Sequence, residues 1–194
     1  MSLLSTAVAQ SVKLVATPHM RAFQFIKENK KKEALAFINN YLGTNPNDPQ
    51  MNFWKAKILN ESPNSADRDE ALQLYISLSD NFPELAEPHN NLGVIYAAQL
   101  DYSRAIHYFE LALKANPNYA LASENLADVY VQQATKYYKQ AIDNDSGNKS
   151  AKAKLEKINA STITTSPLEF LPNGQPNLMN SKNSSNISPN SPAK

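Results

Sequence analysis

Apolar and small residues between positions 86 and 119 recur in two stripes at helical spacing. They are Leu92, Gly93 and Tyr96 in the first stripe, and Ala105, Phe109 and Ala112 in the second. A polar stretch, QLDYS at residues 99–103, separates the stripes, and Pro117 follows the second. Apolar positions three or four residues apart predict amphipathic helices, and a proline ends a helix because it excludes the preceding residue from the α region. The pattern therefore predicts two antiparallel helices joined by a tight turn.

The same pattern recurs twice upstream. The places of the second stripe are filled by Ala71, Tyr75, Leu78 and Pro83 in one unit, and by Ala34, Ile38, Tyr41 and Pro46 in the other. The closing prolines Pro46, Pro83 and Pro117 lie 37 and 34 residues apart. We assign the three extra residues to the stretch ESPNSADRD at residues 61–69, where we expect a longer turn.

These residues resemble the tetratricopeptide repeat, a helix–turn–helix unit of about 34 residues. The departures are His89, which stands where the family has its first aromatic residue, and Tyr41, which stands where a small residue is expected. The resemblance, which extends to small exported bacterial members of the family, implies an all-α, right-handed superhelix (α-solenoid). We expect a repeat domain at 15–158, with repeats at about 15–48, 49–85, 86–119 and 120–148, and a capping helix at 149–158.

The fourth unit lacks its turn. Nine residues separate Tyr96 from Ala105 in the third unit, whereas four separate Tyr130 from Ala134 in the fourth. Residues 130–141 contain no Gly, Pro, Asn, Asp or Ser, the residues that form tight turns. The simplest prediction is therefore one long helix from about 121 to 143. The alternative is a kinked, shortened hairpin. A stacked-repeat domain needs a terminal element over its last apolar face, and the fused helix with residues 149–158 would supply it.

Both ends of the chain differ from the repeats. Within residues 1–14, a short apolar stretch ends in small residues at Ala7 and Ala9. This spacing is typical of the back half of an export signal, so we expect a periplasmic or exported protein. A meaningless N-terminus and a cytoplasmic location are the alternatives. Residues 159–194 are rich in Ser, Asn and Pro, and we expect a disordered tail. Its apolar island, residues 166–174, could instead dock on a partner or on the repeats.

Composition argues against several kinds of chemistry. The chain has no cysteine and three histidines, and no pair of them has metal-binding spacing. The formal net charge is +1, which argues against a large nucleic-acid surface, and no apolar run is long enough to span a membrane. We therefore expect no catalytic, cofactor or metal site, and not an enzyme; an enzyme with an unrecognised site is a remote alternative.

The family resemblance implies that a partner binds the concave surface lined by the first helices of the repeats. The residues expected to line this groove are His19, Phe23, Ile26, Lys27, Phe53, Lys57, Asn60, Asn90, Val94, Ala97, Ala98, Glu124, Asp128 and Val131. Phe23 and Phe53 suit an apolar peptide in extended or helical form. The alternative is that both rings pack between adjacent repeats.

The predicted function is that of a protein-interaction scaffold or adaptor. Its partner would be a protein or peptide and not a nucleic acid, and the chain would not be an integral membrane protein. We expect a monomer or a weak homodimer. A structural subunit that self-associates through the terminal helix is the main alternative.

Overall fold

The computed structural model describes residues 17–162, with side chains described for residues 17–160. This part of the chain forms helices and no strands. The helices are α1 (Pro18–Lys27), α2 (Lys31–Leu42), α3 (Pro49–Asn60), α4 (Ser65–Asn81), α5 (Ala86–Ala98), α6 (Tyr102–Ala115), α7 (Ala120–Asn144) and α8 (Lys149–Thr162).

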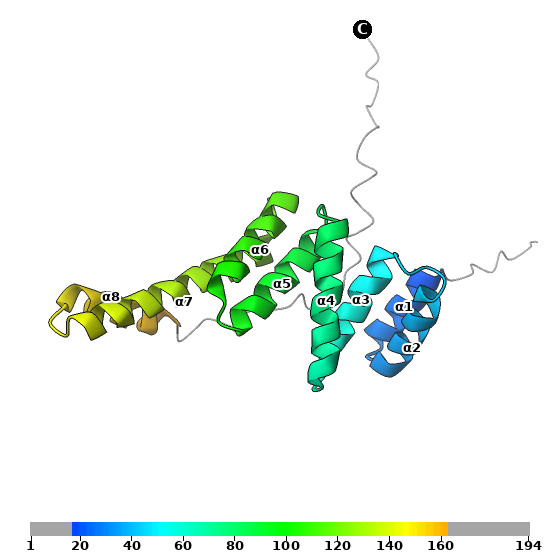
Figure 1. Cartoon of the computed structure of the whole chain (residues 1–194), viewed down its shortest axis with the longest axis horizontal. Coiled ribbons are helices and arrows are strands. Elements are labelled where there is room, and N and C mark those ends of the chain that lie inside the picture. The colour runs from blue at the N-terminus through cyan, green and yellow to red at the C-terminus, as the bar shows by residue number, and fades with distance from the viewer. Residues whose placement is uncertain (1–16, 163–194) are drawn as a thin grey trace, which may run out of the picture.

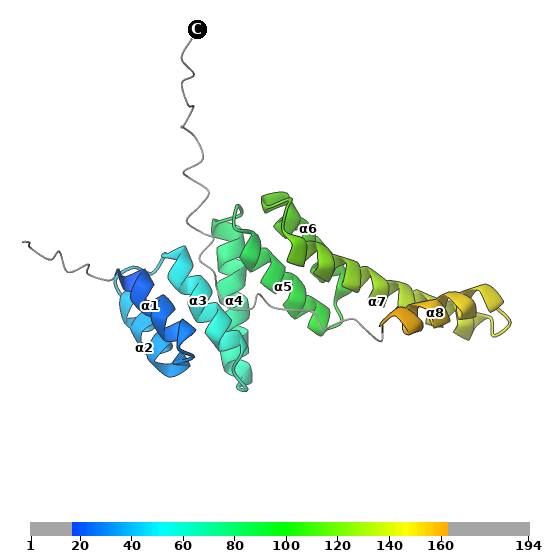
Figure 2. The ribbon, with the colours of Figure 1, turned by 180° about the vertical axis from the view of Figure 1, so that it is seen from behind.

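The helices pack in chain order, each against the next. In Figure 1 they form an elongated row, with α1 and α2 at one end and α7 and α8 at the other. The view from behind in Figure 2 shows the same succession. The all-α solenoid that the family resemblance implies is confirmed.

Polar N-cap residues set where α1 and α3, the first helices of the first two repeats, begin. Thr17 Oγ1 accepts a hydrogen bond from the backbone N–H of Met20, 3.2 Å away, at the start of α1. Asp48 Oδ1 accepts one from the backbone N–H of Met51, 2.9 Å away, at the start of α3. A proline follows each cap residue, where its missing N–H costs no helical hydrogen bond.

The third repeat forms the most tightly buried helix pair. Leu92, Ala105, Phe109 and Ala112 have no exposed surface. Gly93 lies against the ring of Phe109, so the absence of a side chain at Gly93 lets α5 and α6 approach closely. One hydrophobic core contains Tyr75 and Leu78 of the second repeat together with Leu92, Tyr96, Ala105 and Phe109 of the third.

The longer turn expected in the second repeat is largely absent. Residues 61–64 join α3 to α4, only one residue more than residues 99–101 between α5 and α6. The extra residues instead lengthen α4, which has 17 residues against 14 in α6. Asn64 causes this early start, because its side chain accepts a hydrogen bond from the backbone N–H of Ala66.

The fused helix predicted for the fourth repeat is present. α7 runs unbroken for 25 residues, so the kinked hairpin is wrong. α8 turns back beside the second half of α7 and extends to Thr162, four residues beyond the predicted end of the cap. The prediction of a disordered tail from residue 159 is wrong at its start, because residues 159–162 form the end of α8. The rest of the predicted tail, and the export signal predicted at residues 1–14, lie outside the described residues.

Candidate partner-binding surface

Four helices are the first helices of their repeats: α1, α3, α5 and α7. α1 contacts α3 and α5 contacts α7, so first helices of successive repeats are neighbours at both ends of the row. Three sets of predicted groove residues occupy equivalent places on these helices. They are His19, Phe53, Asn90 and Glu124; Phe23, Lys57, Val94 and Asp128; and Ile26, Asn60, Ala97 and Val131.

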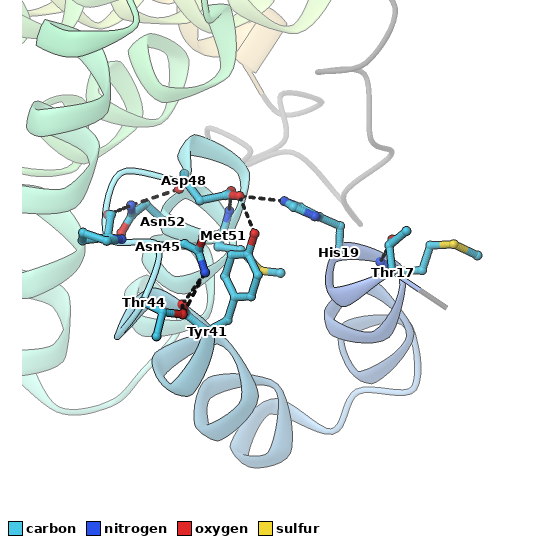
Figure 3. Close-up of polar contacts among 10 residues, drawn as sticks. Thr17, His19, Tyr41, Thr44, Asn45, Asp48, Met51 and Asn52 are labelled. Atoms are coloured by element: carbon cyan, nitrogen blue, oxygen red, sulfur yellow. Dashed lines mark hydrogen bonds and ion pairs between the residues drawn. The ribbon is translucent and has the colours of Figure 1, made fainter. Parts of the chain in front are cut away.

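His19 holds the first two repeats together (Figure 3). Its Nε2 lies 2.9 Å from Oδ2 of Asp48, the residue that caps α3, and Nε2–H donates to this carboxylate. The hydroxyl of Tyr41 donates to the same oxygen at 3.3 Å. The His19 ring also lies edge-on to Tyr41, with centroids 5.7 Å apart. His19, predicted to line the groove, is therefore half-buried and bound within the chain.

Phe23 packs against the first helix of the next repeat. Its ring centroid lies 6.1 Å from that of Trp54, which is 2% exposed. Phe23 itself is half-buried, so part of its ring reaches the surface. Sequence reasoning did not assign Trp54, Tyr41 or Asp48 to this region. The Asp48–Pro49 pair, a common helix start, was the one local signal.

Phe53 does not line an open surface. It is 4% exposed, and its ring meets that of Tyr75 on α4 edge-on, with centroids 6.0 Å apart. The expectation of an exposed aromatic anchor at Phe53 is therefore wrong, and the alternative of packing within the repeats describes it. The physical reason is that α4 covers this face of α3, which the spacing along α3 cannot show.

Three predicted groove residues on α5 are also buried: Asn90, Val94 and Ala97. They are therefore not accessible to a partner on the surface. Asn125 Nδ2 donates to Asn90 Oδ1 at 3.0 Å and joins α5 to α7, while Asn90 Nδ2 has no hydrogen-bond partner. This amide pair is a connection between the third and fourth repeats that sequence reasoning did not identify.

The remaining predicted residues reach the surface. Lys27, Ala98 and Glu124 are exposed, and Ile26, Lys57, Asn60, Asp128 and Val131 are half-buried. Asn60 and Ala98 line a cavity of about 340 Å³ between α3, α4 and α5, together with Leu72 and Ile95. The structure thus brings these two predicted residues together at one hollow.

Burial shifts the pKa values of Lys57 and Asp128, which occupy equivalent positions in the second and fourth repeats. It lowers the pKa of Lys57, although Glu61 opposes the change. Burial raises the pKa of Asp128, and nearby Glu124 raises it further. In both side chains partial loss of water disfavours the charged form, so each would gain from an opposite charge on a bound partner.

The histidines outside this surface have structural surroundings. His89 is buried; its Nε2–H donates to the carbonyl of Pro83 at 3.1 Å, and its Nδ1 accepts from Ser79 Oγ at 3.0 Å. His89 therefore has a packing role. His107 is exposed on α6. Between residues 17 and 162, no cluster of three His, Asp or Glu side chains could hold a metal ion, and no helix is long and apolar enough to cross a membrane.

The paired helices and the close Gly93–Phe109 contact define the class of fold, an α-solenoid of helix–turn–helix repeats. Comparison with known families agrees, because residues 86–119 match the tetratricopeptide repeat. The chain therefore contains a tetratricopeptide repeat and has the fold of this family. Repeats of this family generally mediate protein–protein interaction.

Two curated relatives are similar to part of the chain. One is the uncharacterized protein ycf37 of Pyropia yezoensis, 32% identical over 88 residues, which cover 43% of this chain and 49% of the relative. The other is the uncharacterized protein ycf37 of Cyanophora paradoxa, 36% identical over 80 residues, covering 39% and 46%. The chain spans about half the length of the curated relatives it matches.

Proposed function

We propose that this chain is a non-catalytic scaffold that binds a segment of a partner protein across its first helices. The observation that carries this proposal is a row of three residues at equivalent places that reach the surface, Phe23, Lys57 and Asp128; Val94, the fourth member of the row, is buried. The row places a half-buried ring, a half-buried cation and a half-buried carboxylate on three different repeats of a fold that serves protein interaction.

The charges along this row set the character of the partner segment. A carboxylate on the segment would face Lys57, with Lys27 exposed on the preceding first helix, and a basic residue would face Asp128. An apolar side chain beside the carboxylate would contact Phe23 and Ile26. Such a segment binds in one direction only, since reversal would set like charges against each other.

This proposal modifies the sequence prediction at one point. Phe53 is not expected to contact the partner, because its ring is already buried within the repeat. Phe23 remains, and the lysines become the main determinants of the partner's orientation. An exported location stays a proposal as well, and the partner would then be an exported protein.

The test is selection of binding segments from a displayed library of random peptides, with the full chain as target. We expect the selected peptides to share an acidic and an apolar residue at one end and a basic residue at the other. Lys57→Ala should weaken their binding by about 1–3 kcal/mol, as interface hot spots do. Binding should also weaken with added salt, because charge pairs at a surface are screened.

Lys114→Ala is the matched control, since it removes an exposed lysine from α6, a second helix. Peptides that bind wild type and Lys57→Ala equally, or that lose affinity equally in both lysine variants, would contradict the proposed surface.

A further inference from the structure

Two tyrosines on the fused helix α7 are exposed, although equivalent residues in the third repeat are covered. Tyr130 is 46% and Tyr137 59% exposed. Their counterparts by repeat spacing are Tyr96, which is 5% exposed, and Tyr108, which is half-buried. Tyr96 and Tyr108 stack, with ring centroids 5.4 Å apart and planes inclined by 11°.

The missing turn explains the difference. In the third repeat residues 99–101 fold α6 back on α5, so the two rings meet. In the fourth repeat both tyrosines stand on one continuous helix, seven residues apart, which is about 10 Å along its axis. They therefore cannot stack within one chain.

A second position shows the same uncovered face. Gly93 is buried against Phe109, whereas its equivalent, Ala127, is exposed. By analogy with the third repeat, Ala127 would be covered by the residue equivalent to Phe109. That residue is Tyr138, which lies in the second half of the same helix. Because α7 does not bend, Tyr138 cannot reach Ala127.

α8 does not fill this gap. It lies beside the second half of α7, where Nζ of Lys154 sits 5.6 Å from the centre of the Tyr138 ring. Its buried Ala151 takes the place that buried Ala122 takes on α7, so α8 continues the row as the next first helix. In both views the second half of α7 extends beyond α5 and α6 with α8 as its neighbour.

We propose that two copies of this chain form a dimer through antiparallel α7 helices. The second half of each α7 supplies the second helix that the first half of the other α7 lacks. In this arrangement Tyr130 of one copy stacks on Tyr137 of the other, and Ala127 packs under Tyr138. Each contact occurs twice, as a two-fold axis near residue 133 requires.

Three features favour a second copy as the occupant of this face. The helix carries both halves of the missing hairpin in its own sequence, so its surface is self-complementary. Loss of a hinge turn is a known route to exchange of an identical element between copies. The charges agree as well, because Glu124 and Asp128 lie in the first half of α7 and Lys136 and Lys139 in the second, which favours antiparallel pairing.

The first experiment measures the mass of the full chain in solution over a roughly hundredfold range of concentration, since a dimer dissociates on dilution. We expect a dimer that Tyr130→Ala and Tyr137→Ala each weaken about tenfold or more. Met20→Ala is the matched control, because it removes another exposed apolar side chain from α1 at the opposite end of the row. A monomer throughout, or a dimer that is as strong in both tyrosine variants as in the unaltered chain, overturns the proposal.

The second experiment tests the register. The chain has no cysteine, so introduced thiols react alone. Chains carrying Ala127→Cys are mixed with chains carrying Tyr138→Cys and treated with a short thiol cross-linker. We expect cross-linked dimers in the mixture and few in either variant alone, since identical positions would lie eleven residues, or about 16 Å, apart along the helices. Cross-linking of each variant with itself would indicate parallel helices and overturn the arrangement.

Discussion

Gly93 and Phe109 are so close that no side chain fits between them. A methyl group on Gly93 would lie 2.5 Å from Cε1 of Phe109, well inside van der Waals contact. Phe109 has no exposed surface and therefore has no free space into which its ring could turn. This contact sets how closely the two helices of the third repeat approach.

Gly93→Ala should therefore destabilise the chain by about 1–3 kcal/mol through overpacking. The loss should appear even though alanine favours a helix over glycine by about 1 kcal/mol. Chemical denaturation measures the difference. Gly43→Ala is the control: Gly43 is exposed, has a φ of −58°, and a methyl group there would lie 3.3 Å from its nearest atom. Equal losses in both variants would contradict this account.

Leu100 has a left-handed backbone conformation, with a φ of 62°, at the end of α5. This conformation costs an ordinary L-residue about 1–2 kcal/mol, and asparagine less. Because the Leu100 side chain is 71% exposed, its removal loses little packing. We expect Leu100→Asn to raise the thermal midpoint.

The first repeat supplies the reverse substitution. Asn29, at the end of α1, has a φ of 56° and is already the residue that this conformation favours. Asn29→Leu should lower the thermal midpoint, and a change in the same direction for both variants would refute the backbone explanation.

Phe53 and Phe23 should behave differently when truncated. Phe53→Ala removes a buried ring that contacts Tyr75, and should cost about 3–5 kcal/mol of stability. Phe23→Ala should cost less, because Phe23 is half-buried, and should also reduce affinity for the selected peptides. Melting curves and peptide binding on the same two variants separate the roles. Equal stability losses would assign Phe23 to the core.

The continuity of α7 predicts the effect of a proline in its middle. Ala134→Pro removes a helical hydrogen bond and adds a steric clash, at a cost of about 3 kcal/mol or more. Circular dichroism should show less helix and an earlier thermal transition. Ala134→Ser, which keeps the backbone N–H, is the control and should change stability by under about 1 kcal/mol. A proline variant as stable as the serine variant would argue against a straight α7.

His89 should make stability depend on pH. Burial lowers its pKa in the folded chain below the ordinary value of about 6.5, although the Pro83 carbonyl opposes this. The unfolded chain therefore binds the proton more readily, and stability should fall as pH drops below about 6.5 towards the folded pKa. Denaturation at several pH values, compared with His89→Phe, measures this contribution. The variant should show a flatter profile in that range, and an unchanged profile would contradict this role.

The sequence predicted the helices well because their spacing is a local property. The stripe around Phe109 and the absence of turn formers after Tyr130 suffice to predict α6 and the unbroken α7. The prediction failed at residues 61–64, where the cap formed by Asn64 moved the start of α4 and shortened the turn. Helix starts depend on single hydrogen bonds, which repeat spacing does not specify.

The candidate surface was harder to predict. Spacing assigned His19, Phe53 and Asn90 to one face of the first helices, but each is held by a residue from another element: Asp48, Tyr75 and Asn125. A pattern along one helix shows which residues share a face. It does not show which parts of that face other helices cover.

The sequence by itself therefore determined the order of the helices and the loss of one turn, because both follow from periodicity and turn chemistry, and the family resemblance of the repeats implied the class of fold. Only the tertiary structure decided which equivalent residues are covered. Tyr96 and Tyr130 occupy the same place in successive repeats, yet one is 5% and the other 46% exposed. The reason is physical: α6 folds back over Tyr96, whereas the straight α7 carries its second half away from Tyr130.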